Sequence, residues 1–151
     1  MKAVIQRVSF ACVKVDDEIK GEIESGLLVL LGVHENDTEK EAAALASKIS
    51  GLRIFSDENG KMNLSVNDIG GSALVISNFT LYGDCSHGRR PSYISAARHE
   101  KAEPLYEFFC EKLRENGTDN VQKGVFGADM KVSLLNDGPV TIVIDSNDLH
   151  Y

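Results

Sequence analysis

The chain has 151 residues, of which 42% are hydrophobic, and a formal net charge of −7 at pH 7. This length suits one domain with a full hydrophobic core and leaves no room for a second domain. The acidic balance argues against a protein that coats nucleic acid with a broad basic face, because such binding depends on Lys and Arg side chains that neutralise phosphates.

The longest apolar run, residues 27–31, is far shorter than the roughly 20 residues that a membrane helix needs, and the N-terminus lacks a signal-peptide pattern. The cysteines, Cys12, Cys85 and Cys110, are odd in number and widely spaced. This favours reduced thiols over a disulfide framework or a zinc site. We therefore predict a cytoplasmic protein with no membrane partner.

Strands dominate the first part of the chain. Residues 1–8 and 11–15 are rich in valine and predict two short strands, and Asp16-Asp17 predicts a turn into a third strand over residues 18–23. The continuous apolar run over residues 27–33 is typical of a strand that is covered on both faces.

Two helices are predicted. Thr38 and Glu41 form a capping box, which marks a helix start. The apolar stripe of this helix is Ala42, Leu45, Ala46, Ile49 and Leu52. The second helix is predicted over residues 102–116, with Pro104 in its first turn and Gly117 as its stop signal.

The remaining segments predict further strands. Asp57 and Asn59 before Gly60 hint at a calcium loop, but the later ligands are missing, so a hairpin turn after a strand over residues 52–55 is the better interpretation. The closing strands are predicted at residues 121–126, 130–135 and 140–145. The whole pattern predicts an α+β fold, a strand-rich curved sheet or barrel-like domain over residues 1–146 with two helices packed outside, followed by a tail over residues 147–151.

Two short segments are unusual. In Ser-Asn-Phe-Thr-Leu-Tyr, residues 77–82, polar groups follow an apolar run and so emerge at a strand end. In Asn-Asp-Gly-Pro-Val-Thr, residues 136–141, a Gly-Pro peptide directly precedes a β-branched run, where an ordinary strand disfavours a residue without an N–H. These two segments predict a specialised site.

The common catalytic and cofactor motifs are missing from the sequence, including the nucleophile elbow, the phosphate-binding loop and the dinucleotide fingerprint. The histidines fall in predicted loops or the tail without metal-ligand spacing, and they are His34, His87, His99 and His150. We therefore predict neither a cofactor nor a metal. If the protein is an enzyme, its side chains do not reveal the chemistry.

From residue 84 to residue 101 the charge reverses to a balance of +2, with four basic against two acidic side chains. The basic residues are Arg89, Arg90, Arg98 and Lys101. Taken alone, such a patch is best interpreted as a solvated loop.

The chain resembles the D-aminoacyl-tRNA deacylases from Met1 to about Ser146. The segments that carry the resemblance are residues 1–8, 26–33, 52–55, 88–92, 124–130 and above all 136–141. The resemblance implies a homodimeric hydrolase that removes D-amino acids from tRNA, and also glycine misplaced on alanine tRNA. An enzyme that holds only the 3′ end of a tRNA needs few phosphate contacts, and the candidates to provide them are Arg89, Arg90, Arg98 and Lys101.

By the same resemblance, Gly138 and Pro139 are joined by a cis peptide bond and reach into the pocket of the partner subunit, where they reject L-amino acids. From the sequence alone, a cis bond before proline has a prior of only about 5%. Arg7 corresponds to the arginine that holds this segment, a role that suits the fixed donors of a guanidinium group. Glycine, which has no side chain, is accepted.

Ser77, Asn78 and Phe79 are predicted to bind substrate, with Phe79 near the terminal adenosine, and Asn78 stands where the family usually has Gln. Thr80 is predicted to position the substrate, because a threonine nucleophile needs a neighbouring base and the sequence identifies none. The resemblance implies RNA-assisted catalysis, in which the 2′-hydroxyl of the terminal adenosine activates water. Two alternatives stay open: a deacylase with Thr80 as nucleophile, and a tRNA-binding protein without activity.

Overall fold

The computed structural model describes residues 1–150. Its strands are β1 (Lys2–Val15), β2 (Glu18–Ile23), β3 (Gly26–Gly32), β4 (Phe55–Ser56), β5 (Met62–Leu64), β6 (Ser72–Ser77), β7 (Asn120–Lys123) and β8 (Lys131–Asp145). Its helices are α1 (Glu39–Ser50), α2 (His99–Glu115) and the short 3-10 helices η1 (Phe79–Tyr82) and η2 (Ser146–Asp148). Within the described part of the chain, no helix is both long and apolar enough to cross a membrane.

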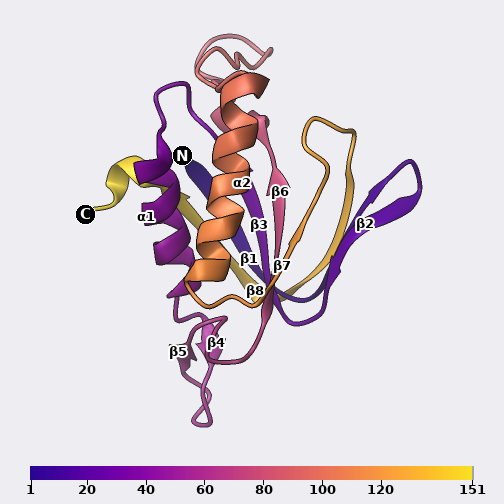
Figure 1. Cartoon of the computed structure of the whole chain (residues 1–151), viewed down its shortest axis with the longest axis vertical. Coiled ribbons are helices and arrows are strands. Elements are labelled where there is room, and N and C mark those ends of the chain that lie inside the picture. The colour runs from indigo at the N-terminus through magenta and orange to yellow at the C-terminus, as the bar shows by residue number, and fades with distance from the viewer. Residues whose placement is uncertain (151) are drawn as a thin grey trace.

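The long strand β1 organises the main sheet. Along one edge it pairs antiparallel with β3 through its first half and with β2 through its second half, and β8 pairs along the other edge. Strands β6 and β7 continue the sheet from β3 in parallel. Strand β2 returns toward β7, since a side chain on Gly21 would lie 2.8 Å from the Lys123 carbonyl oxygen. The mixed sheet is therefore barrel-like, and α1 and α2 stand side by side against one side of it (Figure 1), so the predicted α+β architecture is confirmed.

The core has two parts that meet at β3. Leu27, Val29 and Leu31 belong to the larger cluster, which lies between the sheet and the helices. Leu28 belongs to a smaller cluster with residues of β1, β2 and β6. The continuous apolar run of β3 is thus covered on both faces, as predicted.

Several predicted strand boundaries are wrong. Strand β1 is one strand rather than two, and β8 continues through the Gly-Pro peptide where two strands were predicted. The pairing of β1 with β8 shifts register on either side of Val8, so bulges accommodate the irregular residues without ending the strands. The strand predicted over residues 121–126 stops at Lys123, and the one over residues 52–55 shrinks to Phe55–Ser56.

Helix α1 follows its prediction closely. The backbone N–H of Thr38 donates to Glu41 Oε2 at 2.7 Å, and the Thr38 hydroxyl accepts from Lys40, so the capping box is formed. Helix α2 begins at His99, three residues before its predicted start, which moves Pro104 beyond the first turn and makes His99 helical rather than part of a loop. Inside a helix, proline lacks its own N–H donor and its ring crowds the carbonyl four residues earlier, so α2 contains Pro104 at a cost in stability.

The end of the domain is more firmly packed than predicted. Ser146 is buried, and its hydroxyl accepts a hydrogen bond from the ammonium group of Met1, which also contacts Asp37 Oδ1 at 2.7 Å. Residues 146–148 form η2, so the tail predicted over residues 147–151 begins within a short 3-10 helix. The domain boundary at residue 146 stays a prediction, and Tyr151 lies outside the described residues.

Candidate active site

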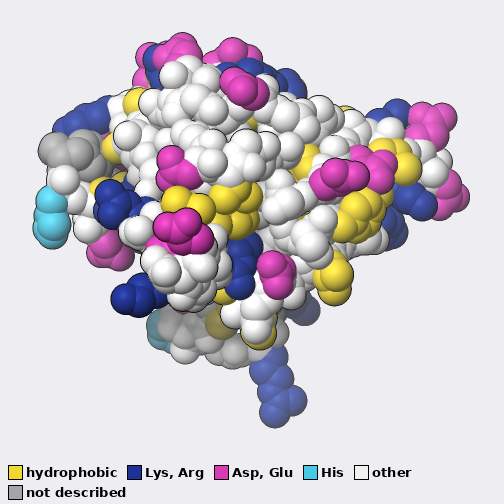
Figure 2. All heavy atoms as spheres, turned by 90° about the horizontal axis from the view of Figure 1, so that it is seen from below, with side chains coloured by type: hydrophobic (Ala, Val, Ile, Leu, Met, Phe, Trp, Pro, Cys, Tyr) yellow, Lys and Arg dark blue, Asp and Glu magenta, His cyan; other side chains and the backbone are white. Residues whose placement is uncertain are grey.

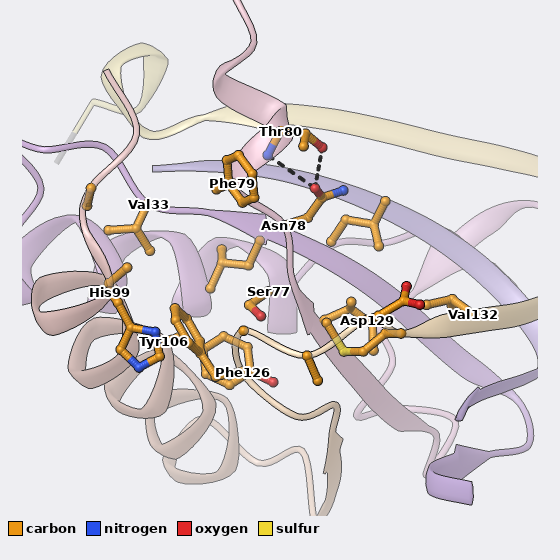
Figure 3. A pocket seen from close by; sticks show the side chains of 18 residues that line it. Val33, Ser77, Asn78, Phe79, Thr80, His99, Tyr106, Phe126, Asp129 and Val132 are labelled. Atoms are coloured by element: carbon orange, nitrogen blue, oxygen red, sulfur yellow. Dashed lines mark hydrogen bonds between the residues drawn. The ribbon is translucent and has the colours of Figure 1, made fainter. Parts of the chain in front are cut away.

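A cavity of about 710 Å³ opens where β3 and β6 end beside the start of α2. Figure 3 shows Phe79 and Thr80 on one side of this pocket, His99, Tyr106 and Phe126 gathered on another, and Asp129 near Val132 on a third. The other lining side chains are mostly apolar and come from β3, β6, α2 and the segment after β7. The four predicted residues Ser77, Asn78, Phe79 and Thr80 all line this cavity.

These four residues lie where β6 turns into η1. The Asn78 N–H still donates to the Leu31 carbonyl at 2.8 Å, but the chain then leaves the sheet. The Asn78 side chain caps η1, because its Oδ1 accepts from the Thr80 N–H at 3.2 Å and also from the Thr80 hydroxyl. Phe79 is 57% exposed, so it is not a core residue. The prediction of polar groups at a strand end is confirmed.

The hydroxyl of Thr80 is therefore bonded to an amide oxygen. Within residues 1–150, its hydrogen-bond partner is Asn78 and not a histidine or a carboxylate. Among the pocket-lining side chains only His99, Tyr106 and Asp129 can titrate. Tyr106 is buried, its hydroxyl donates to the Val75 carbonyl at 2.7 Å, and burial raises its pKa. This arrangement does not supply Thr80 with a general base.

The wall opposite Thr80 was not predicted as part of the site. It consists of residues 126–130 together with His99, whose ring meets Phe126 edge-on at 4.8 Å between centroids. The Nε2 of His99 lies 2.8 Å from Glu103 Oε2. Residues 124–130 carry part of the family resemblance, and this was the one signal in the sequence that could have assigned this wall to the site. Their contact with α2 is tertiary, so sequence spacing does not reveal it.

Gly138 and Pro139 do not line the cavity of their own chain. They lie on β8, exposed, and the peptide bond between them is cis. Gly138 has a φ of +136°, and an added Cβ would lie 3.0 Å from Arg7 Nη2. A side chain larger than hydrogen is thus excluded by backbone conformation and by space.

Arg7 and Asn136 fix the Gly-Pro segment from both sides. Arg7 Nε donates to the Asp137 carbonyl at 2.9 Å, while Nη1 donates to the Ile54 carbonyl at 2.7 Å. Asn136 Oδ1 accepts from the Val140 N–H at 3.1 Å. The Arg7 side chain is only 14% exposed. Asn136 was not among the predicted site residues, although it belongs to the unusual segment.

The basic residues lie at one end of the molecule, in and after the loop that precedes α2 (Figure 1). Arg89 and Arg90 are exposed in this loop, Arg98 is the N-cap residue of α2, and the Lys101 ammonium donates to the Glu35 carbonyl. Elsewhere, the face in Figure 2 mixes acidic and basic side chains around small hydrophobic patches. Within residues 1–150, no group of three or more His, Cys, Asp or Glu side chains could hold a metal ion.

The fold and most of the sequence are shared with known proteins. The family model "D-Tyr-tRNA(Tyr) deacylase" matches residues 4–145. A D-aminoacyl-tRNA deacylase of Thermosipho melanesiensis is 58% identical over 146 residues, covering 97% of each chain, and one of Thermus aquaticus is 56% identical over 148 residues, covering 98% of this chain and 97% of the relative. The chain therefore belongs to the D-Tyr-tRNA(Tyr) deacylase family of tRNA-editing hydrolases.

Solved structures agree with this fold. One described as c-Myc DNA Unwinding Element Binding Protein superposes with a TM-score of 0.91 at 42% identity, covering 96% of this chain and 98% of the other. A probable eukaryotic D-amino acid tRNA deacylase superposes with a TM-score of 0.81 at 15% identity, covering 95% and 97%. The second comparison shows the fold alone.

Proposed function

We propose that the chain hydrolyses the ester of D-aminoacyl-tRNA, and of glycine misplaced on alanine tRNA, to free tRNA and amino acid while it rejects L-aminoacyl-tRNA. The observation that carries this proposal is a Gly138–Pro139 segment that is held by hydrogen bonds on both sides, is exposed, and does not line the pocket of its own chain. A second subunit can use such a segment as part of its own pocket.

The surface around this segment supports a homodimer. Val143 and Leu135, which flank it on β8, are 71% and 63% exposed, and Phe10 on the neighbouring strand is 38% exposed. Strand β8 pairs with β1 along one edge, and within residues 1–150 its other edge has no strand partner. Exposed apolar side chains on a free strand are typical of a surface that another chain covers. In the proposed dimer, Gly138 and Pro139 of each subunit enter the partner's pocket.

The stereochemical task explains the choice of main-chain atoms. D- and L-amino acids differ in the direction that the side chain takes from Cα, so a filter must place rigid atoms where an L side chain would lie. The carbonyl oxygens of the Gly138–Pro139 segment cannot rotate away as a side chain can, because Arg7 and Asn136 hold the backbone. The same oxygens attract the substrate ammonium group. Glycine presents no side chain to exclude and passes the filter.

We assign the chemical step to the RNA. An aminoacyl ester is a reactive bond, and the 2′-hydroxyl of the terminal adenosine lies next to it and can activate water. The chain then positions the ester through Ser77, Asn78 and Thr80, with Phe79 beside the terminal adenosine, and its backbone N–H groups stabilise developing charge. Rigid positioning alone can supply much of a rate enhancement.

Thr80→Ala is expected to lower single-turnover hydrolysis of D-tyrosyl-tRNA by less than about tenfold, because a positioning hydroxyl contributes roughly 1 kcal/mol. Replacing the terminal adenosine by its 2′-deoxy form should abolish hydrolysis by the unchanged protein. If Thr80 were the nucleophile, Thr80→Ala would abolish hydrolysis and the 2′-deoxy substrate would still be hydrolysed. Rapid-quench measurements with saturating protein separate the chemical step from binding.

The test of the function itself gives the purified protein three substrates: D-tyrosyl-tRNA, L-tyrosyl-tRNA, and alanine tRNA that carries glycine. Hydrolysis of the first and third, with the second intact, is the expected result. If L-tyrosyl-tRNA were hydrolysed as fast as D-tyrosyl-tRNA, the proposed chiral filter would be contradicted. Binding of all three without hydrolysis would instead establish a tRNA-binding protein.

The salt dependence of tRNA binding is expected to be shallow. We assign the contacts with the tRNA backbone to Arg89, Arg90, Arg98 and Lys101, and a protein that holds only the 3′ end needs few others. A plot of log Kd against log salt concentration should therefore have a slope well below that of a protein contacting about 6 phosphates. A slope of that size or steeper would show a broad contact with the tRNA body.

A further inference from the structure

An exposed aromatic pair lies beside the pocket, and one of its two rings, that of Tyr93, takes no part in the proposed function. The rings of Phe79 and Tyr93 meet edge to face, with centroids 5.2 Å apart and planes at 79°. Phe79 is 57% exposed and Tyr93 is 38% exposed. Phe79 lines the cavity, whereas Tyr93 does not, so Tyr93 extends the aromatic surface beyond the pocket.

The position of Tyr93 is set by backbone contacts. The loop before it is closed at its base by two hydrogen bonds between Asp84 and Ser92, of 2.8 and 3.0 Å. Its ring lies against the end of η1, where a side chain on Gly83 would come within 3.0 Å of Tyr93 Cε1. The carbonyl of Tyr93 also accepts from the Ala96 N–H at 3.1 Å. The backbone on both sides of Tyr93 is therefore held, and its ring packs against Gly83 and Phe79, which lowers the conformational entropy that a stacking ligand would remove.

The geometry leaves aromatic surface for a planar ligand. In an edge-to-face contact the two rings do not stack on each other, so the ring that presents its edge keeps both faces free of the other ring. Unpaired bases are recognised by stacking on such rings, beside basic groups that bind the backbone. Arg89 and Arg90 are exposed in the same loop, between Asp84 and Ser92. The positive charge of this loop thus suits the backbone of an RNA strand.

We infer that Phe79 and Tyr93 form a stacking platform for the unpaired bases at the 3′ end of the tRNA, with Tyr93 as a binding residue outside the pocket. This inference rests on the proposed function, because the substrate's 3′ end must pass the pocket mouth to place its ester beside Thr80. The terminal base of the RNA lies against Phe79, and the RNA strand continues over Tyr93 toward Arg89 and Arg90.

The experiment measures the affinity of a microhelix RNA that ends in single-stranded CCA and carries an amide-linked, non-hydrolysable D-tyrosine. Further versions lack the base at the last or at the penultimate nucleotide. The variants are Tyr93→Ala and Tyr93→Phe, with Ile94→Ala as a matched control, since Ile94 is the neighbouring residue and is 87% exposed but has no ring. Thermal unfolding of each variant verifies that it is folded.

With the intact RNA, Tyr93→Ala should weaken binding by about fivefold to a hundredfold, whereas Tyr93→Phe and Ile94→Ala should stay close to the unchanged protein. When the RNA lacks the base that stacks on Tyr93, Tyr93→Ala should bind it as tightly as the unchanged protein does. Equal losses for all three RNAs, or no loss with the intact RNA, would overturn the inference. So would a lower dimer content of Tyr93→Ala in sedimentation, which would place the ring between two copies of the chain.

The unchanged protein separates this inference from the proposed function. If it hydrolyses D-tyrosyl-tRNA but shows no coupling between Tyr93 and a base, only the platform is wrong. If the coupling is present and hydrolysis is absent, the platform stands and the deacylase function is wrong.

Discussion

Gly138→Ala is expected to reduce hydrolysis of D-tyrosyl-tRNA by about 100-fold, the scale of loss that a misplacement of roughly 1 Å at an active site can cause. The added Cβ would lie 2.9 Å from Val140 Cγ2 and 3.0 Å from Arg7 Nη2, and the φ of +136° disfavours any L residue. The backbone must therefore shift, and with it the carbonyl oxygens that we propose as the chiral filter.

Gly60→Ala is the matched control for this substitution. Gly60 also has a positive φ, of +75°, but nothing lies within 4 Å of its added Cβ, and it belongs to the β4–β5 hairpin. The Gly60→Ala protein should keep full activity. A comparison of the two variants therefore separates the general strain of alanine at positive φ from the specific effect on the proposed filter. Full activity of a folded Gly138→Ala protein would show that the segment does not contact substrate.

Arg7→Ala is expected to lower activity by at least about tenfold and the free energy of unfolding by about 1.5–3 kcal/mol, the range for hydrogen bonds to charged groups. Arg7 bonds the carbonyls of Asp137 and Ile54 at the same time, so its loss frees the Gly-Pro segment and leaves the carbonyl of a buried residue unpaired. Arg7→Lys should recover little, because one ammonium group does not reproduce the two directed donors.

Thermal unfolding and single-turnover hydrolysis, measured on the same samples, check this prediction. The melting temperature should fall by about 2–4 °C for each kcal/mol lost. Arg53→Ala is the control, since Arg53 is exposed and precedes Ile54 directly, and it should change stability by less than about 0.5 kcal/mol. An Arg7→Ala protein that loses stability but keeps full activity would limit Arg7 to a role in folding.

Local signals in the sequence were reliable where short-range chemistry decides the structure. The capping box at Thr38 starts α1 as predicted, and the apolar run of β3 is covered on both faces. The polar residues after β6 also gather in one pocket, because a strand end places them there. The contacts of the capping box are local, whereas the apolar run of β3 indicates burial by its composition alone, since the residues that cover it come from distant parts of the chain.

Features that depend on distant partners were not predictable in the same way. Strand β8 runs through Gly138 and Pro139 because bulges in its pairing with β1 accommodate them, and a single sequence does not show that pairing. The pocket wall at Phe126 and His99 joins two segments that meet only in the folded chain. Tyr93 was missed for the same reason, because its neighbour Phe79 lies 14 residues earlier in the chain.

The most direct test of the account uses a purified heterodimer of two inactive chains that carry different C-terminal tags, since the N-terminus is buried. One chain carries Gly138→Ala. The other carries Ala128→Trp, which fills the cavity that Ala128 lines. If each segment serves the partner's pocket, one of the two symmetry-related sites is intact, and the heterodimer should have about half the activity of the unchanged dimer. A heterodimer as inactive as its two parent homodimers would contradict the cross-subunit filter.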